Sequence, residues 1–264
     1  MTTSATPRLP ASGTPGDVLR GAALPLKAFA LIFRTPRLFG WSLVAAAVTA
    51  ATLVGLAVGL WPLAQHLADG LVGHDATWQR VTSMGLGVLF FAGAFVVGAL
   101  TVPNVLLAPL QDPLSEATEV RCGDFTPPPF SLPGLVRGTL ESLAHTLLRV
   151  AFMALGFVVL WPLNLVPVAG GVAWLVLSST WSMFWLAAEH LSNPMARHLH
   201  PFRQVVRALR QRLALALGFG AALWVLLWVP VLNFFLMPVA VVAGTLLYRG
   251  LRAAGTLPAP PSRG

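Results

Sequence analysis

Two arginines on either side of a proline are the residues whose type and spacing best suit an anion. Arg34 and Arg37 lie at the start of a long uncharged stretch, with Pro36 between them. At the beginning of a helix, exposed backbone amides and the helix dipole would add to their positive charge. An anion that leaves water needs such N–H groups, because its hydration energy is large. Arg34 and Arg37 are therefore the predicted capture site for an anion.

The elements that must position these groups are four stretches without Asp, Glu, Lys or Arg. They cover Leu38–Leu63, Val81–Gln111, Val150–Ala188 and Leu213–Tyr248. About 20 apolar residues in a helix span the ~30 Å hydrocarbon core, so the first two stretches predict one crossing each and the last two predict hairpins. Charged residues are only 10% of the chain, against roughly 25% in soluble domains. The fold class is predicted to be an all-α integral membrane protein.

Each of the last two stretches is broken near its middle. Asn164 is followed by Pro167 and Gly170, and Asn233 is followed by Pro238. A helix that begins again after each break would direct its N-terminus toward the middle of the membrane, where the asparagine amides can donate hydrogen bonds to an anion. The alternative is that both asparagines satisfy the turn backbone and pack the hairpins together.

The uncharged legs of these hairpins are short. As helices, Val150–Leu163 and Met237–Tyr248 reach only about 21 and 18 Å, less than the hydrocarbon thickness. We therefore expect two long transmembrane helices plus two re-entrant, hemi-penetrating hairpins, with the turns buried in protein or facing water. The alternative is a pair of ordinary two-span hairpins whose ends use interfacial residues.

Positive charge is distributed on one side of the predicted membrane. With a cytoplasmic N-terminus, two spans and two hairpins place all but one of the 17 Lys and Arg residues in the cytoplasm, the exception being Arg80. This positive-inside pattern predicts that both termini are cytoplasmic. It also accounts for the net charge of +8 without a nucleic-acid partner.

Two amphipathic interfacial helices are predicted outside the spans. Arg20, Lys27 and Arg34 share one face of a helix that is expected to begin with Asp17 as its N-cap and to be interrupted at Pro25. A second basic face consists of Arg203, Arg207 and Arg210. We expect both faces to bind anionic lipid headgroups of the bilayer, or else to line the mouth of an anion path.

The remaining segments outline the domain organisation. Residues 1–16 are expected to be a disordered tail, residues 17–250 one membrane domain and residues 251–264 a flexible tail. The second span is predicted to continue as a helix to Arg121, with Glu116 and Glu119 on one side. A stiff proline-rich linker is expected at Phe125–Pro133.

No residue pattern favours catalysis, a cofactor or a metal. Neither a Ser, His and acid arrangement nor H-E-x-x-H is present, and Cys122 is the single cysteine. The histidines lie at segment ends or in loops: His66, His74, His145, His190, His198 and His200. We therefore expect no enzyme activity and no bound metal.

Four motifs occur in order along the chain: Ala108–Leu110, Leu165–Gly170, Gly218–Gly220 and Val229–Ala240. Together they resemble the CysZ sulfate permease family, which shares its domain with the etoposide-induced membrane proteins, and the resemblance is strongest at Pro230–Ala240. The resemblance covers about residues 17–250, in order. It implies two spanning helices with two hemi-penetrating hairpins in a homo-oligomer of the bacterial inner membrane, and sulfate uptake that is proton-coupled or passive.

The resemblance also implies a sulfate site where the first spanning helix begins, beside a proline and a pair of consecutive basic residues. The matching stretch keeps Pro36, but Phe39 and Gly40 occupy the positions of the basic pair. We expect Arg34 and Arg37 to supply the charge instead. Two functions follow: a permease or channel for sulfate or a related oxyanion, and alternatively a non-transporting scaffold whose hairpins organise lipid.

Overall fold

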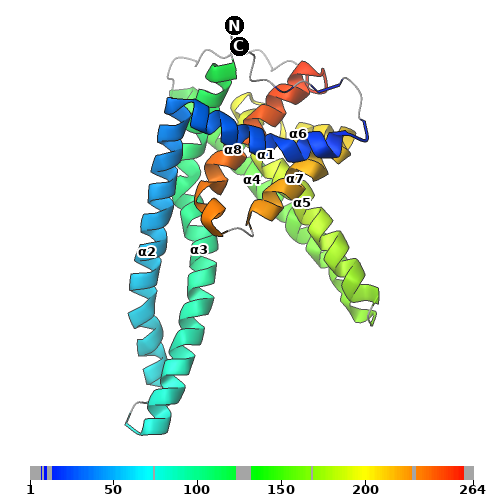
Figure 1. The fold of residues 1–264 in the computed structure, drawn as a ribbon. Helices are drawn as coiled ribbons and strands as arrows, with labels where there is room; N and C mark the ends of the chain where they lie inside the picture. The colour runs from blue at the N-terminus through cyan, green and yellow to red at the C-terminus, as the bar shows by residue number, and fades with distance from the viewer. Residues whose placement is uncertain are drawn as a thin grey trace. The chain divides into compact units, whose positions relative to one another are not determined.

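The computed structural model describes residues 7, 9–10, 14–73, 75–122, 132–167, 169–227 and 230–258. Every element in these ranges is a helix (Figure 1), so the predicted all-helical class is confirmed for the described residues. Five helical segments are long and apolar enough to cross a membrane: Pro36–Val72, Thr77–Pro103, Ala144–Leu165, Ala169–Arg197 and Leu236–Ala253. The chain divides into unit 1, Met1–Ser42 with Gln111–Gly264, and unit 2, Leu43–Leu110.

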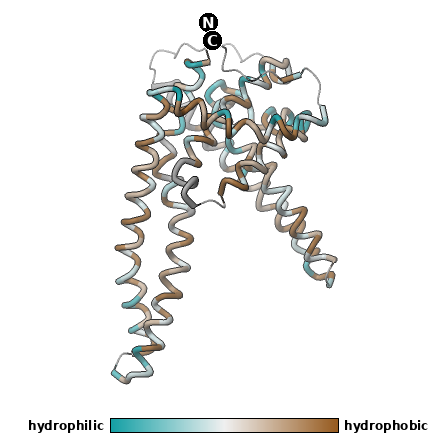
Figure 2. The backbone as a smooth tube through the Cα atoms, in the orientation of Figure 1, coloured by the Kyte–Doolittle hydropathy of each residue, from teal (hydrophilic) through white to brown (hydrophobic). Residues whose placement is uncertain are grey.

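Unit 2 is a hairpin made from the long parts of α2 (Pro36–Val72) and α3 (Thr77–Cys122). Apolar residues predominate along both helices (Figure 2), and in the most apolar part of each candidate span only 6% is buried. The few contacts between the helices include an edge-on ring pair of Trp61 and Phe91, 5.5 Å apart, and a hydrogen bond from the Ser83 hydroxyl to Asp69. Such exposed apolar helices are compatible with lipid as solvent.

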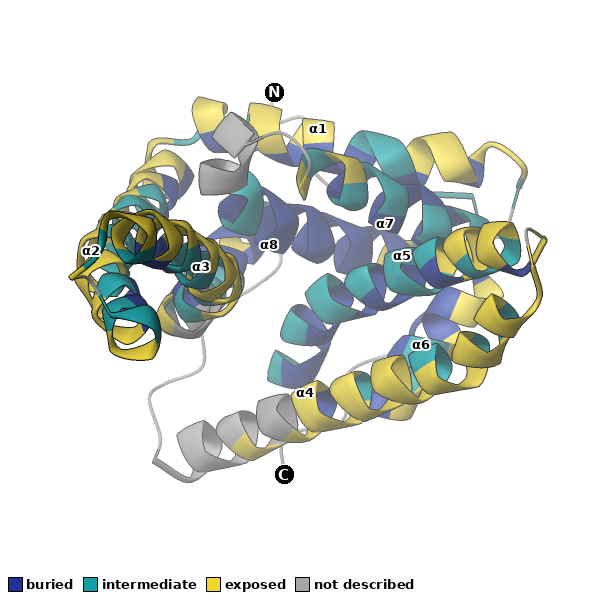
Figure 3. Cartoon of the chain, turned by 90° about the horizontal axis from the view of Figure 1, so that it is seen from below, coloured by how far each residue is buried: buried dark blue, intermediate teal, exposed yellow. Residues whose placement is uncertain are grey.

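Unit 1 is built around α8 (Pro230–Ala253), whose residues from Val239 to Leu251 are buried (Figure 3). It packs against α1 (Asp17–Arg34), α5 (Ala169–Arg197) and α7 (Leu213–Leu227). The crossing of α1 and α7 depends on two glycines. A Cβ on Gly21 would collide with the Leu215 carbonyl, and one on Gly218 would collide with the Val18 carbonyl. The two backbones can approach this closely only without side chains at these positions.

Two details of α1 differ from the sequence prediction. Gly16 is the N-cap and Asp17 is the first helical residue. The helix also continues through Pro25, which is buried. A proline removes one helical hydrogen bond; here the packing of α1 against α7 and α8 compensates for that loss.

The first hairpin turns where the sequence predicts. α4 (Leu132–Leu160) leads into a 3₁₀ turn at Trp161–Leu165, and α5 begins at Ala169. The apolar segment of α4 is longer than the predicted leg, however, because it extends from Ala144 through Arg149 to Leu165, 22 residues in all. The predicted leg ends at Arg149 because that residue is charged, but Arg149 is paired with Glu189 at 3.0 Å. The length of this apolar segment therefore no longer argues against a full crossing of the membrane by the first hairpin.

The second hairpin differs from the prediction in the position of its turn. Helix α7 ends at Leu227 and α8 begins at Pro230, so Asn233 and Pro238 lie within a helix rather than in the turn. Proline is favoured at the first position of a helix, because its missing N–H has no partner there. Helix α7 has 15 residues, about 22 Å, which is shorter than the hydrocarbon core. It follows α6 (Phe202–Gln211) with a bend of 102°.

Parts of both expected tails are packed against unit 1. Leu9 contacts the core beside Gly250, and the Pro10 carbonyl accepts a hydrogen bond of 2.8 Å from Arg212. Helix α8 continues to Ala253, and Leu257 beyond it is buried. Leu257 is thus buried and Leu9 partly buried, while a disordered tail at residues 1–16 and a flexible tail at residues 251–264 stay predictions. Most of the predicted proline-rich linker lies outside the described residues.

Candidate functional site

The predicted capture residues meet at the joint between α1 and α2. Helix α1 ends at Arg34, Thr35 is the one residue between the helices, and Pro36 is the first residue of α2. The side chains of Arg34 and Arg37 are exposed, and within the described part of the chain neither forms an ion pair. The structure thus leaves both guanidinium groups available to a ligand.

Backbone geometry adds to the positive character of this joint. The Thr35 carbonyl accepts a hydrogen bond of 2.9 Å from the Phe39 N–H, which starts the α2 hydrogen-bond ladder. The N–H groups of the first helical turn have no acceptor inside the helix, and the helix dipole is positive at this end. Arg34, in the last turn of α1, offsets the opposite dipole of that helix.

Sequence reasoning missed Thr35 as a member of the site. Its hydroxyl oxygen is buried and has no hydrogen-bond partner among the described residues. A hydroxyl can donate one hydrogen bond to an anion. The available signal was the Thr-Pro pair directly before an apolar stretch, a frequent beginning of a helix.

In the first hairpin turn, the Asn164 side chain is hydrogen-bonded to the backbone of the turn itself. The Asn164 side chain is exposed and donates a hydrogen bond of 3.1 Å to the Trp161 carbonyl. The Gly170 N–H donates to the Val166 carbonyl at 3.1 Å, just after the exposed Pro167. This geometry agrees with the alternative role for Asn164, satisfaction of the turn backbone. Across the described residues, no hydrogen bond or ion pair connects this turn with Arg34 or Arg37.

The second pair of predicted path residues lies along α8. Pro238 is buried inside the helix, and Asn233 belongs to the first turns of α8. The position of the Asn233 side chain is outside what the structure describes. The turn between α7 and α8 therefore contains neither Asn233 nor Pro238.

A buried ionic cluster that the sequence did not reveal joins α3 to α5. Glu119, which is 1% exposed, accepts hydrogen bonds from Arg197 Nη1 at 3.1 Å and from His198 Nε2 at 2.8 Å. Arg197 also pairs with Asp112 at 3.3 Å. Sequence analysis placed Glu119 on one side of a helix, but its partners lie 78 and 79 residues further along the chain. The cluster neutralises a charge that would otherwise be costly to bury.

Further polar contacts continue along the same part of α3. The Asn193 amide donates to Gln111 at 2.7 Å, and the Ser115 and Thr245 hydroxyls lie 2.8 Å apart. These contacts are to α5 and α8, respectively. Together with the Glu119 cluster, they attach the last part of α3 to the core of unit 1.

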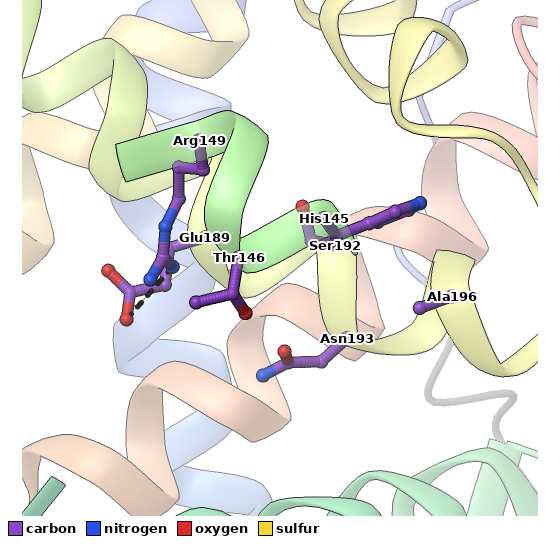
Figure 4. A pocket seen from close by; sticks show the side chains of 7 residues that line it. All are labelled: His145, Thr146, Arg149, Glu189, Ser192, Asn193 and Ala196. Carbon is purple, nitrogen blue, oxygen red and sulfur yellow. Dashed lines mark ion pairs between the residues drawn. The ribbon is translucent and has the colours of Figure 1, made fainter. Parts of the chain in front are cut away.

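The small pocket between α4 and α5 is polar (Figure 4). It is lined by His145, Thr146, Arg149, Glu189, Ser192, Asn193 and Ala196. Its volume of about 10 Å³ suffices for about one water molecule. Because Arg149 is already paired with Glu189 at 3.0 Å, this pocket has neither the room nor the free charge for sulfate.

The buried carboxylate of Asp17 holds the start of α1. It accepts hydrogen bonds from the Thr14 hydroxyl at 3.0 Å and from Arg20 at 2.9 Å, and it pairs with Arg212 at 3.4 Å. Burial alone would raise the pKa of Asp17, but the hydrogen bonds and the Arg212 charge together lower it below its ordinary value. The Asp17 carboxylate thus has a structural role at the start of α1.

Over the residues that the structure covers, no cluster of three His, Cys, Asp or Glu side chains suits a metal ion.

Comparison with known proteins places these features in a family. The family described as "Sulfate transporter CysZ/Etoposide-induced protein 2.4" matches residues 24–238. The chain is 30% identical over 184 residues to the sulfate transporter CysZ of Salmonella paratyphi A, which covers 67% of this chain and 72% of that protein. The CysZ proteins of Salmonella enteritidis and Salmonella gallinarum match to the same extent.

Proposed function

Because the chain belongs to the family of the sulfate transporter CysZ and the etoposide-induced protein 2.4, we propose that it is a membrane permease for sulfate or a closely related oxyanion. The observation that carries this proposal is the joint between α1 and α2, which lies within the matched residues. There, Arg34 and Arg37 are exposed and form no ion pair with other described residues.

Capture of the anion takes place at this joint. The two guanidinium groups supply charge-assisted hydrogen bonds to sulfate oxygens, which are stronger than neutral ones. The first-turn amides of α2 and the Thr35 hydroxyl add donors, and Pro36 fixes the backbone at the first position of the helix. Arg34 and Arg37 thus take the place of a consecutive basic pair.

The membrane arrangement follows from helix length. Helices α2 and α3 cross the bilayer as the two long spans, and both termini face the cytoplasm, as the distribution of Lys and Arg favours. The length of α7, 15 residues, supports a re-entrant second hairpin. For α4 and α5, the support for a re-entrant arrangement is the resemblance to the family and not helix length, because Ala144–Leu165 and Ala169–Arg197 are long enough to cross. The exposed apolar surface of unit 2 and of the segment Ala144–Leu165 is available to lipid and to further copies in a homo-oligomer.

The proposal is tested by sulfate flux into liposomes. Purified protein in liposomes is expected to admit radiolabelled sulfate faster than empty liposomes do. Replacement of both Arg34 and Arg37 by Ala should reduce uptake at least tenfold, since each charge-assisted hydrogen bond contributes about 1.5–3 kcal/mol. Arg121→Ala, which removes an exposed arginine from the end of α3, is the matched control and should retain uptake.

Two results would contradict the proposal. If wild-type vesicles pass no sulfate while a known anion transporter in parallel vesicles does, the permease function is wrong and a lipid-organising scaffold becomes the better account. If the double variant transports like the wild type, sulfate enters elsewhere.

A further inference from the structure

We propose that the outer face of α6 binds anionic phospholipid, with one headgroup phosphate held between Arg203 and Arg207. This inference is independent of the sulfate site, because it concerns other residues and another ligand.

Helix α6 lies nearly perpendicular to an apolar helix. The bend between α6 and α7 is 102°, and α7 contains no charged residue. A short amphipathic helix at a right angle to a membrane-inserted helix lies along the membrane surface. The bend is held by Arg212, which is buried, pairs with Asp17 at 3.4 Å and donates to the Pro10 carbonyl at 2.8 Å.

The two faces of α6 differ sharply in chemistry. Its inner face is buried and consists of Phe202, Val205, Ala208 and Leu209. Its outer face carries three exposed arginines, Arg203, Arg207 and Arg210. No carboxylate is present on the helix, and none of the three arginines has an ion-pair partner anywhere in the described ranges. The charge of this face must therefore be balanced by an anion from outside the chain.

A hollow on this face has the donors that a phosphate needs. Arg203, Gln204 and Arg207 line a space of about 240 Å³. The Gln204 side-chain oxygen lies 2.8 Å from His200 Nδ1 and accepts a hydrogen bond from it. The amide NH₂ of Gln204 is then left to donate outward. Two guanidinium groups and one amide thus surround the space.

His200 supports this arrangement as a neutral residue. Burial lowers its pKa most, and the nearby charges of His198 and Arg252 lower it further, against the opposing hydrogen bond to Gln204. The contact of 2.8 Å between His200 Nδ1 and the Gln204 oxygen holds the amide from inside the fold.

A lipid suits this place better than a free anion. Leu213, the first residue of α7, follows the basic face directly and is 47% exposed. A ligand with a phosphodiester and an acyl chain contacts both the arginines and this apolar side chain. A free anion contacts only the arginines and the Gln204 amide, and each cation at a membrane surface contributes modestly by itself.

The experiment compares two soluble short-chain lipids on the full-length protein in detergent. Dioctanoyl phosphatidylglycerol is titrated against dioctanoyl phosphatidylcholine, and bound lipid is counted by native mass spectrometry. We expect the anionic lipid to bind at least tenfold more tightly. Replacement of both Arg203 and Arg207 by Gln should weaken binding of the anionic lipid about 25-fold, since each cation contributes roughly fivefold. Gln204→Leu should weaken it less, and Arg121→Gln should leave binding unchanged.

Free anions are distinguished from lipid by competition. Sodium sulfate and sodium chloride are compared at equal ionic strength, because salt alone screens the arginines. Equal displacement of phosphatidylglycerol by the two salts supports a lipid site, whereas stronger displacement by sulfate would show that the site selects free oxyanions and would overturn the proposal. Equal binding of both lipids, or unchanged binding in a folded R203Q/R207Q variant, would also overturn it. Arg34→Ala with Arg37→Ala should retain lipid binding, so failure here leaves the permease proposal untouched.

Discussion

Glu119 of α3 and Arg197 of α5 form an ion pair of 3.1 Å in which the carboxylate is almost completely buried. His198 donates to the other carboxylate oxygen at 2.8 Å. The pair fixes the last part of α3 against the core of unit 1, although 78 residues separate its members in the chain. Its importance for stability can be measured directly.

Glu119→Gln should destabilise the protein by about 1.5–3 kcal/mol, because it weakens the charge-assisted hydrogen bonds that Arg197 and His198 donate to the buried carboxylate, while Asp112 still pairs with Arg197. The measurement is thermal unfolding in detergent. Glu116→Gln is the matched control, since Glu116 lies one turn away and forms no ion pair with other described residues. It should change stability by no more than about 0.5 kcal/mol. Equal melting temperatures for the two variants would show that the pair does not stabilise the fold.

Thr35→Val should raise the Michaelis constant for sulfate uptake about tenfold. The substitution removes a hydroxyl that has no hydrogen-bond partner among the described residues and lies between Arg34 and Arg37 in the chain. Thr35→Ser keeps the hydroxyl and should transport like the wild type. Uptake into liposomes over a range of sulfate concentrations provides the measurement. If the valine variant transports normally, the hydroxyl is not a sulfate ligand.

Gly218→Ala should cost about 1–3 kcal/mol of stability, because the added methyl collides with the Val18 carbonyl where α1 crosses α7. Gly55→Ala in α2 is the control: nothing lies within 4 Å of its added Cβ, and alanine favours the helix by about 1 kcal/mol. Melting temperatures of the two variants should therefore move in opposite directions. A stable Gly218→Ala protein would mean that the two helices are not in backbone contact.

Acidification should reduce stability through His200. The pKa of His200 is lowered in the folded protein, and burial is the largest cause. The contribution of His200 to stability is therefore complete above its ordinary pKa of about 6.5. As the pH falls below that value, the unfolded chain binds a proton that the folded protein accepts only at lower pH, and stability is lost. Melting temperatures of wild type and His200→Gln between neutral and acidic pH measure this. The variant should lose part of the dependence, whereas His66→Gln, at an exposed position, should retain it.

Reading the sequence located most helices, and its errors have identifiable causes. The turn at Trp161–Leu165 was predicted because proline and asparagine interrupt an apolar stretch. The same logic failed in the next stretch, since Pro230 starts α8 and Pro238 is accommodated inside it. Asp17 was expected as an N-cap; its carboxylate instead pairs with Arg212 from a distant part of the chain.

The sequence alone determined that the chain is helical, that it contains uncharged segments of membrane length and that Arg34 and Arg37 flank the start of a span. These properties depend on local composition, because every backbone group of a membrane helix is satisfied within its own segment. Tertiary structure decided which charges are neutralised and which stay free. Arg149, Arg197 and Arg212 find carboxylates from other helices, and such pairs form only when the fold brings residues distant in the chain within about 4 Å.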